Sequence, residues 1–411
     1  MHIRSSRRLL LVAPALVLVA ACGSSTSSAG TQGAASAPTT TGASASSGAA
    51  PSGSTCSTKT PPSTDSAIRA AKAGLEKAAA ITSSWSGPTD GPKAQKVGGT
   101  VVVVPQLSAN AGDLGVVNGF KEAARAMGWK VKVIDGGGST ANNLAAFDQA
   151  LASNPIGIAV SSFDPKSAEP EFAKAKAKGV PVVGNHVGFG PGRQSEAPSL
   201  FTNVTSNPAA IARVAVDCAI VASGGKAGVT IAGCGSQVQI CTTKEDAMKA
   251  EIATCPGCSL LAQHDYPFQD ATQREGGIAA ADLQKYGAKL TYMLSINDIY
   301  WDSAIPALKA AGVGPTGPPL MIAAGDGSPA AFQRIRVSQY QIATVAEPLN
   351  EHGWQLADEL NRSLANAPAS TYVTYPHLTT VENVNSEGGD KNVYDPANGY
   401  RDQYKKIWGV G

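Results

Sequence analysis

The sequence predicts an α/β protein built from two doubly wound parallel sheets. Short apolar runs alternate with helical segments over residues 99–183, and the same alternation returns over residues 208–345. A helix between two strands carries the chain back to the edge where the next strand starts, so strict alternation favours parallel strands with helices on both faces. The 411 residues and the hydrophobic content of 43% are sufficient for two cores of this kind.

In the first unit, runs rich in Val and Ile predict buried strands, and the segments between them have helical periodicity. The strands are expected at 99–105, 130–134, 156–160 and 180–183, and the helices at 115–127, 142–153 and 167–178. An Ala-rich helical pattern at 65–80 and a connector rich in Pro and Gly, extending to residue 97, precede this unit.

The second unit shows the same alternation of strands and helices, with more of each. Its helices are expected at 208–222, 243–254, 272–286, 303–311 and 329–337, and its strands at 228–232, 260–264, 290–294, 320–324 and 342–345. A further helix is expected at 352–365, and the tail ends in an aromatic-bearing segment at 400–408.

Residues 1–21 have the composition of an export signal. Arg4, Arg7 and Arg8 precede an apolar run at 9–21, which is too short to span a bilayer of roughly 30 Å as a helix. The run ends in Val-Ala-Ala-Cys, which resembles the bacterial lipobox, in which the cysteine, here Cys22, receives diacylglycerol. An ordinary secretory signal with a chance cysteine is the alternative. We expect an exported protein held by lipid at the outer face of the cytoplasmic membrane, with no membrane-spanning segment.

A low-complexity tether is expected at 22–63. Small and polar residues dominate it, and they cannot bury enough surface to offset the entropy of ordering. The 33 Lys and Arg nearly balance the 31 Asp and Glu, and three of the arginines lie in the export signal. The exported chain is therefore close to neutral, which argues against a surface that holds nucleic-acid backbone.

Six cysteines remain after Cys22, an even number for an oxidising compartment, so one or more disulfides are expected. They are Cys56, Cys218, Cys234, Cys241, Cys255 and Cys258. Local pairing is possible for Cys234 with Cys241 and for Cys255 with Cys258, but spacing does not determine the connectivity. The CPGC motif at 255–258 also matches a thioredoxin-like redox pair, which should open a helix after a strand. Here it follows a predicted helix and precedes a predicted strand, so we do not expect redox catalysis.

Several blocks resemble the type I periplasmic binding proteins, in particular the ribose- and sugar-binding branch that feeds ABC importers. The blocks are VVVVPQLSANAGDLGVVNGFKEAARAMGWKVKVID, IGIAVSSFDPKSAEPEFAKAKAKGVPVVGNH, LSINDIYWDSAIPALKAAG and IAAGDGSPAAFQRI. Asn-Asp before a helix and Gly-Asp-Gly before a helix are typical of this family and of the repressor cores related to it. The resemblance extends from residue 99 to about 378.

The resemblance implies two Rossmann-like lobes joined by a three-segment hinge, with a ligand cleft between them at the carboxyl ends of the strands. One lobe would hold 98–203 and 348–378, and the other 204–347. Residues 64–97 would form an N-terminal helix and connector, and 379–411 a last hinge crossing and tail.

In the first lobe, Gln106 and Asn110 occupy positions where the family has polar ligand contacts. The family then usually has Pro-Phe-Phe, whose rings stack on a sugar, but here the residues are Ala111, Gly112 and Asp113. We count Asp113 among the candidates. Without these rings, the first loop lacks the surface on which the family usually stacks a sugar.

At a later strand end, Asn185 and His186 stand where the family commonly has Asp-Arg, and both can form hydrogen bonds to a ligand. Phe268 and Trp301, the latter next to Tyr300, are candidates to replace the missing stacking surface. The alternative for both aromatic residues is packing in the core, and for the histidine a structural role.

In the second lobe, the resemblance implies that Lys244, Asn297 and Asp326 contact the ligand, and Glu347 stands where the family often has Gln at a hinge. Two carboxylates facing a cavity require donors, which implies hydroxyl or amine groups on the ligand, or the lysine nearby. The alternative for Asp326 is a cap on the helix expected at 329–337.

We therefore expect a solute-binding lipoprotein that captures a small polar ligand, a sugar or sugar-like molecule, and delivers it to an ABC permease and ATPase. A receptor of the same fold that signals to a membrane sensor is the alternative for the partner. An aromatic, nucleoside or amino compound is the alternative for the ligand. No catalytic residue, metal or cofactor is expected, because the sequence has no GxSxG, HExxH, Walker or post-strand GxGxxG motif. The related repressors carry a DNA-binding helix-turn-helix where this chain has its export signal.

Overall fold

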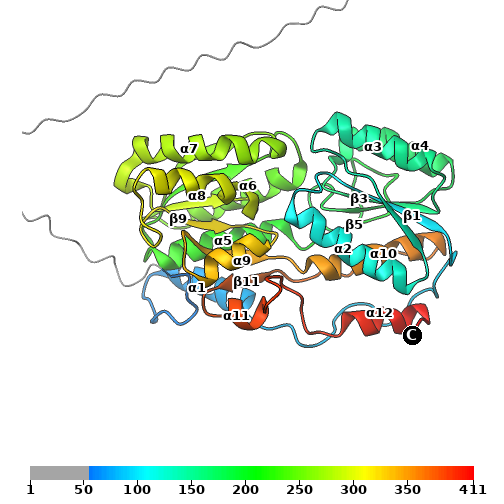
Figure 1. Ribbon diagram of the computed structural model, residues 1–411. Helices are drawn as coiled ribbons and strands as arrows, with labels where there is room; N and C mark the ends of the chain where they lie inside the picture. The colour runs from blue at the N-terminus through cyan, green and yellow to red at the C-terminus, as the bar shows by residue number, and fades with distance from the viewer. Residues whose placement is uncertain (1–54) are drawn as a thin grey trace, which may run out of the picture. The chain divides into compact units, whose positions relative to one another are not determined.

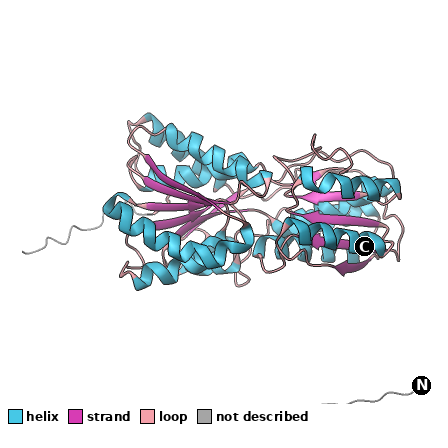
Figure 2. Cartoon of the chain, turned by 90° about the horizontal axis from the view of Figure 1, so that it is seen from above, coloured by secondary structure: helices cyan, strands magenta, loops and turns pink. Residues whose placement is uncertain are grey.

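The computed structural model describes residues 55–411, in which the chain forms two α/β sheets side by side (Figure 1). Helices cover both faces of each sheet (Figure 2), so the predicted fold class is confirmed. We call the five-stranded sheet with its helices the first lobe, and the six-stranded sheet with its helices the second lobe. The export signal, Cys22 and most of the predicted tether lie outside the described residues.

The first lobe has an all-parallel sheet in the order β2-β1-β3-β4-β5. Its strands are β1 (Thr100–Pro105), β2 (Lys130–Val133), β3 (Gly157–Ser161), β4 (Val182–Asn185) and β5 (Asn203–Val204). Its helices are α2 (Ala111–Ala126), α3 (Thr140–Ala152), α4 (Pro165–Ala177) and α10 (Leu349–Leu364). Val101 and Val103 pack with α2 and α10, while Val102 and Val104 pack with α3 and α4. Because successive side chains point to opposite faces, a strand covered on both sides is apolar at every position.

The second lobe has a sheet in the order β11-β10-β9-β8-β6-β7. Its strands are β6 (Gly228–Gly233), β7 (Ser259–Asp265), β8 (Tyr292–Ser295), β9 (Leu320–Ala323), β10 (Gln341–Ala346) and β11 (His377–Thr380). Its helices are α1 (Ser66–Ala78), α5 (Pro208–Ala222), α6 (Gln239–Ala253), α7 (Ala271–Tyr286), α8 (Trp301–Ala310) and α9 (Pro329–Arg336). Ile231 packs with α1 and α5 on one face, whereas Met293 packs with α7 and α8 on the other.

One boundary differs from the expectation. The strand β11 pairs antiparallel with β10, so residues 377–378, expected in the first lobe, belong to the second sheet. The chain therefore returns to the second lobe before His377. Neither β11 nor the two-residue β5 was predicted, because strands this short carry no apolar run that distinguishes them from loops.

Several helices begin earlier than periodicity predicted. The helix α2 starts at Ala111 instead of 115, since Asn110 caps it by accepting a hydrogen bond from the Gly112 N–H at 3.2 Å. The helices α6 and α10 also start about one turn before the predicted residue. These first turns lack apolar periodicity, and the cap residue of α2 and the first turn of α6 line the cavity described below.

The N-terminal connector (79–97) joins the two lobes outside the hinge. It follows α1, which packs on α5. The disulfide between Cys56 and Cys218 ties the residues that precede α1 to the same helix. The connector then reaches α10, where the Gln95 N–H donates to Asn361 Oδ1 at 2.8 Å and Arg362 donates to the Asp90 carbonyl at 2.6 Å.

The C-terminal connector (381–399) also runs from the second lobe to the first. It leaves β11, passes through α11 (Val384–Glu387) beside α9, and leads to α12 (Tyr400–Trp408), which lies against α10 (Figure 1). Trp408 stacks on Trp354 with ring centroids 5.4 Å apart, and its indole N–H donates to Asp358 Oδ1 at 2.7 Å. The two connectors thus add covalent and packed links between lobes that the hinge already joins. No helix within residues 55–411 is long and apolar enough to cross a membrane.

The Cys56–Cys218 disulfide is expected to stabilise the fold strongly, because it closes a sequence separation of 162 residues. Loop entropy predicts that the double variant Cys56→Ser/Cys218→Ser loses roughly 5 kcal/mol of unfolding free energy. The matched control, Cys255→Ser/Cys258→Ser, opens a separation of 3 residues and should lose roughly 2 kcal/mol. Urea unfolding under non-reducing conditions measures both. Equal losses would contradict a role of the long-range disulfide in holding the N-terminal segment.

Candidate functional site

A cavity lies between the two lobes at the carboxyl ends of the parallel strands. We call it the interlobe cavity. Its lining from the first lobe is Gln106, Asn110, Ser162 and His186, and from the second lobe Cys234, Val238, Ile240, Cys241, Lys244, Phe268, Ile296, Asn297 and Asp326. Its volume of about 30 Å³ holds about two water molecules. The described arrangement of the lobes is therefore a closed one, and a larger molecule enters only when the lobes separate.

The first-lobe wall is polar. Gln106 follows β1 directly and Asn110 caps α2, and both side chains are buried. The Asn110 Oδ1 atom accepts the Gly112 N–H, which leaves the amide NH2 group as a donor toward the cavity. This wall can therefore both donate and accept hydrogen bonds.

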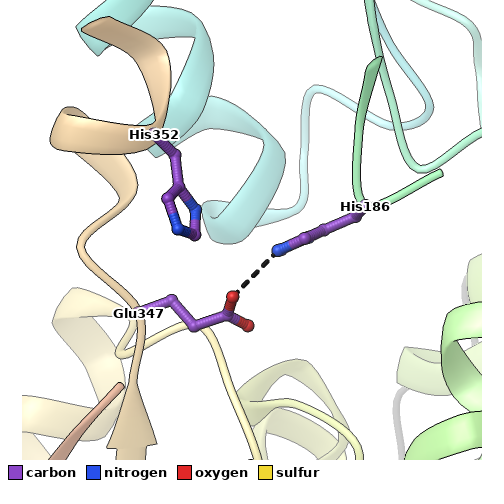
Figure 3. A group of neighbouring side chains, drawn as sticks. All are labelled: His186, Glu347 and His352. Atoms are coloured by element: carbon purple, nitrogen blue, oxygen red, sulfur yellow. Dashed lines mark hydrogen bonds and ion pairs between the residues drawn. The ribbon is translucent and has the colours of Figure 1, made fainter. Parts of the chain in front are cut away.

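A charge network links this wall to the second lobe through Glu347. His186 follows β4, and its Nε2 atom lies 3.0 Å from Glu347 Oε2 (Figure 3). Lys244 Nζ lies 3.4 Å from Glu347 Oε1 and donates to the Ile296 carbonyl at 3.3 Å. Glu347 stands in the segment between β10 and α10, where the chain crosses between lobes. One carboxylate thus receives a cation from each lobe.

The ionisation of this network follows from its charges. Burial opposes ionisation of Glu347, but the charges of His186 and Lys244 outweigh it and hold the pKa of this carboxyl below its usual range. Burial also opposes protonation of His186, yet the neighbouring carboxylate raises the pKa of its imidazole. The charged forms of the two partners therefore stabilise each other.

His352, on α10, is the third member of the group in Figure 3. Its Nε2 atom lies 2.6 Å from Thr374 Oγ1, which lies 2.8 Å from Ser206 Oγ. Burial lowers the pKa of His352 to about 3, so the ring is neutral at physiological pH. Because Ser206, His352 and Thr374 stand in or beside the three segments that cross between lobes, this contact ties the hinge together.

Among the described residues, His186, Glu347 and His352 form the group whose geometry could hold a metal ion, with ligand atoms within 4.8 Å of one another. The charge balance does not fit a divalent cation. Glu347 already faces His186 and Lys244, and a metal would have to displace the imidazole proton and lie beside the ammonium group. We interpret the group as an ion-pair network.

Asp326 reaches the interlobe cavity from a strained turn. It follows β9 with φ of 67°, a left-handed conformation, between two glycines. Its carboxylate packs on the first turn of α2, where a Cβ atom on Gly112 would lie 2.5 Å from Oδ1. Gly112 is thus the residue that allows this approach.

Burial raises the pKa of Asp326 to about 7, an effect that the charge of Lys244 opposes. The alternative role as a helix cap belongs instead to Ser328, whose hydroxyl accepts the Ala331 N–H at 3.1 Å. The Asp326 carboxylate therefore remains available to the cavity.

The two residues after β8 and Ile296, Asn297 and Asp298, have different roles. Asn297 lines the cavity and accepts the Ile299 N–H at 3.3 Å. Asp298 points away and accepts the N–H groups of Gly327 and Ser328, each at 2.9 Å. It thereby holds the turn that presents Asp326.

Two candidate polar residues have structural partners instead of cavity positions. Asp113 accepts hydrogen bonds from the hydroxyls of Ser161 and Ser162 and from the Leu107 N–H. Asn185 donates to the Val204 carbonyl at 2.8 Å and accepts from Ser161. Neither residue lines the cavity, because both satisfy buried groups at the strand ends.

The aromatic candidates separate in the same way. Phe268 lines the cavity, whereas Trp301 is fully buried in the second-lobe core, as is its neighbour Tyr300. Trp301 is therefore not a replacement for the missing stacking surface. Glu347 also lies behind the lining and acts through its two ion pairs.

Sequence reasoning missed Ser162 and the segment 234–241 as parts of the site. Ser162 follows β3 directly, so the rule for polar residues at strand ends could have found it. Cys234, Val238, Ile240 and Cys241 gave no such signal, because apolar residues near a strand end are indistinguishable from core residues.

Residues 101–367, well over half of the chain, match the family model described as a periplasmic binding protein domain. The chain belongs to this family. The resemblance seen in the sequence is thereby confirmed. No curated protein matches the sequence significantly.

Three solved structures are similar to this periplasmic binding protein. An ABC transporter solute binding protein from Agrobacterium vitis with bound allitol is 21% identical with a TM-score of 0.60, over 70% of this chain and 97% of that chain. A second solute binding protein from Agrobacterium vitis, bound with α-D-tagatopyranose, is 18% identical with a TM-score of 0.65, over 72% of this chain and 99% of that chain. The binding component of the arabinose ABC transporter from Shewanella, bound to L-arabinofuranose, is 17% identical with a TM-score of 0.62, over 75% and 97%. At these identities the likeness shows the fold.

The raised pKa of Asp326 makes the stability of this periplasmic binding protein depend on pH. Between about pH 4 and 7 the folded state keeps a proton that the unfolded state releases, so this residue lowers the free energy of unfolding as the pH rises. Asp326→Asn, which tolerates the same left-handed backbone, should be more stable than the wild type at pH 8 by about 2–4 kcal/mol. The two proteins should converge near pH 4.

Urea unfolding at pH 4, 6 and 8 checks this expectation. The control is Asp390→Asn, which removes the same charge from an exposed position. Identical pH profiles for the wild type and Asp326→Asn would show that ionisation of the Asp326 carboxyl does not lower the free energy of unfolding, which would contradict a raised pKa.

Proposed function

We propose that the protein captures a sugar or sugar alcohol between its lobes and delivers it to an ABC importer. The observation that carries this proposal is the interlobe cavity, to which both lobes contribute buried hydrogen-bonding groups at the carboxyl ends of their strands. The family match and the ligands bound in the similar structures, allitol, tagatopyranose and arabinofuranose, support it.

The chemistry of the lining suits a polyhydroxylated ligand. The Asp326 carboxylate accepts hydroxyl protons, Lys244 donates, and the amides of Gln106, Asn110 and Asn297 do both. The positive charge of Lys244 is already balanced by Glu347, so the cavity favours a neutral ligand over a strongly charged one. Apolar members of the second-lobe wall can cover the C–H groups of a sugar.

Capture requires the lobes to open and close. The closed cavity is too small to admit a monosaccharide, so the ligand must bind first to separated lobes. A ligand contacts both walls at once only when the lobes are closed. It therefore binds the closed state more tightly than the open state, and this difference in affinity favours closure. An importer can then recognise the closed form. Glu347, held from both sides at the hinge, contributes to the stability of that form.

The ligand class is tested by thermal shift on the exported chain carrying Cys22→Ser, which keeps all six other cysteines. The panel contains allitol, D-tagatose, L-arabinose and D-allose, together with nucleosides, amino acids and small aromatic compounds. A ligand at 100 times its Kd should stabilise the fold by about 2.7 kcal/mol and raise the melting temperature. Binding confined to nucleosides, amino acids or aromatic compounds would contradict the sugar assignment, and silence throughout would contradict capture of this class of ligand.

Asp326→Ala should weaken binding of the best sugar at least tenfold, because it removes charge-assisted hydrogen bonds of roughly 1.5–3 kcal/mol each. Isothermal titration calorimetry measures the change. The matched control is Asp390→Ala, at an exposed position outside the cavity, which should bind like the wild type. Equal affinity of both variants would remove Asp326 from the binding site.

We further propose that Cys22 carries the lipid that holds the protein at the outer face of the cytoplasmic membrane. The apolar run before it and the Val-Ala-Ala-Cys sequence support this assignment. Cys22→Ser should move the protein from the membrane fraction to the soluble exported fraction, as seen by immunoblotting after fractionation. The control, Cys56→Ser, should stay with the membrane. Retention of Cys22→Ser in the membrane fraction would indicate an uncleaved signal as the anchor instead.

A further inference from the structure

A short disulfide-closed segment forms a continuous part of the second-lobe wall. Cys234 follows β6 directly, Cys241 stands in the first turn of α6, and a disulfide joins them across a separation of 7 residues. Both cysteines line the interlobe cavity, as do Val238 and Ile240 between them. We call residues 234–241 the disulfide loop. The bridge is thus part of the cavity surface and not only a brace behind it.

The disulfide loop gives the cavity an apolar side. A disulfide has no hydrogen-bond donor and its sulfurs are weak acceptors, so it presents a surface similar to that of an aliphatic side chain. Together with Phe268 and Ile296 the loop faces the amides, Ser162 and His186 of the first lobe. A ligand that fits must carry hydroxyl groups toward the first lobe and toward Lys244, Asn297 and Asp326, and C–H groups toward the disulfide loop. The disulfide loop can therefore cover the C–H groups of a sugar, as an aromatic ring would.

The same loop reaches across to the first lobe. Gln237 Nε2 donates to the Gly138 carbonyl at 3.0 Å, and Gln237 Oε1 accepts the Phe268 N–H at 2.7 Å. Gln239 also hydrogen-bonds to Glu196 of the first lobe. Closure of the lobes and the shape of the apolar wall are therefore coupled through one segment.

Other contacts hold the start of the loop without the disulfide. Glu245 Oε1 accepts the Gly235 N–H at 2.8 Å, and Thr242 Oγ1 donates to the Gly235 carbonyl at 2.9 Å. Opening the disulfide should therefore leave β6 and α6 in place. It would loosen the turn between them, residues 236–238, which brings Val238 to the wall.

We propose that the Cys234–Cys241 disulfide is a specificity-determining element of the ligand site. It supplies apolar surface to one face of a sugar-like ring and holds the disulfide loop in the position that meets the first lobe. The inference rests on the proposed function and adds to it the requirement for an oxidised loop and for a ligand with a C–H face. Reduction of the bridge by an added dithiol, which is oxidised to its own disulfide while the two cysteines become thiols, weakens binding.

The test compares two double variants that each remove a short disulfide of the second lobe. Cys234→Ser/Cys241→Ser opens the bridge at the cavity, and Cys255→Ser/Cys258→Ser opens one that does not line it. Calorimetric titrations use allitol, D-tagatose and L-arabinose as probes, and circular dichroism monitors the fold. The first variant should lose at least tenfold in affinity for the sugar that the wild type binds best, and the second should stay within twofold.

A second pair keeps the inference testable if the first double variant does not fold. Ile240→Ala shortens the loop's side chain at the cavity, whereas Ile252→Ala makes the same change in the buried core of the same helix. The first should weaken binding at least threefold, and the second should lower stability while leaving affinity within twofold.

The outcomes separate the two claims. A wild type that binds a sugar while both cavity variants bind it equally well contradicts the role of the disulfide loop alone. A wild type that binds none of the probes contradicts the proposed function, and with it this inference. Equal losses in both double variants would mean that the disulfides act through general stability, which also overturns the inference.

Discussion

The charge network around Glu347 is the interaction on which the arrangement of the lobes depends. The carboxylate lies in a segment that crosses between lobes, and it receives His186 from the first lobe and Lys244 from the second. All three groups are buried, so each charge would be costly without the others. The network therefore favours the closed arrangement, in which both cations reach the same carboxylate. His352 extends it into the hinge through Thr374 and Ser206.

The terminal segments add a second constraint on lobe motion. The N-terminal connector follows α1, which packs on α5, and ends on α10, and the C-terminal connector leads from β11 to α12 (Figure 1). Trp408 of α12 stacks on Trp354 of α10. Both lie outside residues 101–367, the part that matches the family model. A hinge with two additional links has less freedom to open than three crossing segments alone, which bears on how far the lobes separate to admit a ligand.

The cavity combines polar groups from both lobes with an apolar part of the second-lobe wall, and each has its own support. Asp298 holds the turn that presents Asp326, and Gly112 leaves the space into which that carboxylate fits. The disulfide between Cys234 and Cys241 shapes the opposite part of the second-lobe wall. The absence of a side chain at Gly112 thus admits Asp326, and residues 234–241 contribute apolar surface to the same cavity.

The sequence by itself determined the alternation of strands and helices, because apolar periodicity is a local property. Its motifs also pointed to the family, and the resemblance to that family implied most of the polar cavity lining, namely Gln106, Asn110, His186, Lys244, Asn297 and Asp326. Only the tertiary structure decided which strand-end groups face the cavity. Asp113, Asn185 and Trp301 have the right chemistry, but their partners come from distant segments and turn them into structural residues. The same reason applies to the pairing of Cys56 with Cys218, to the placement of β11 and to the cavity position of Cys234 and Cys241, since each depends on contacts between segments that lie apart in the chain until it folds.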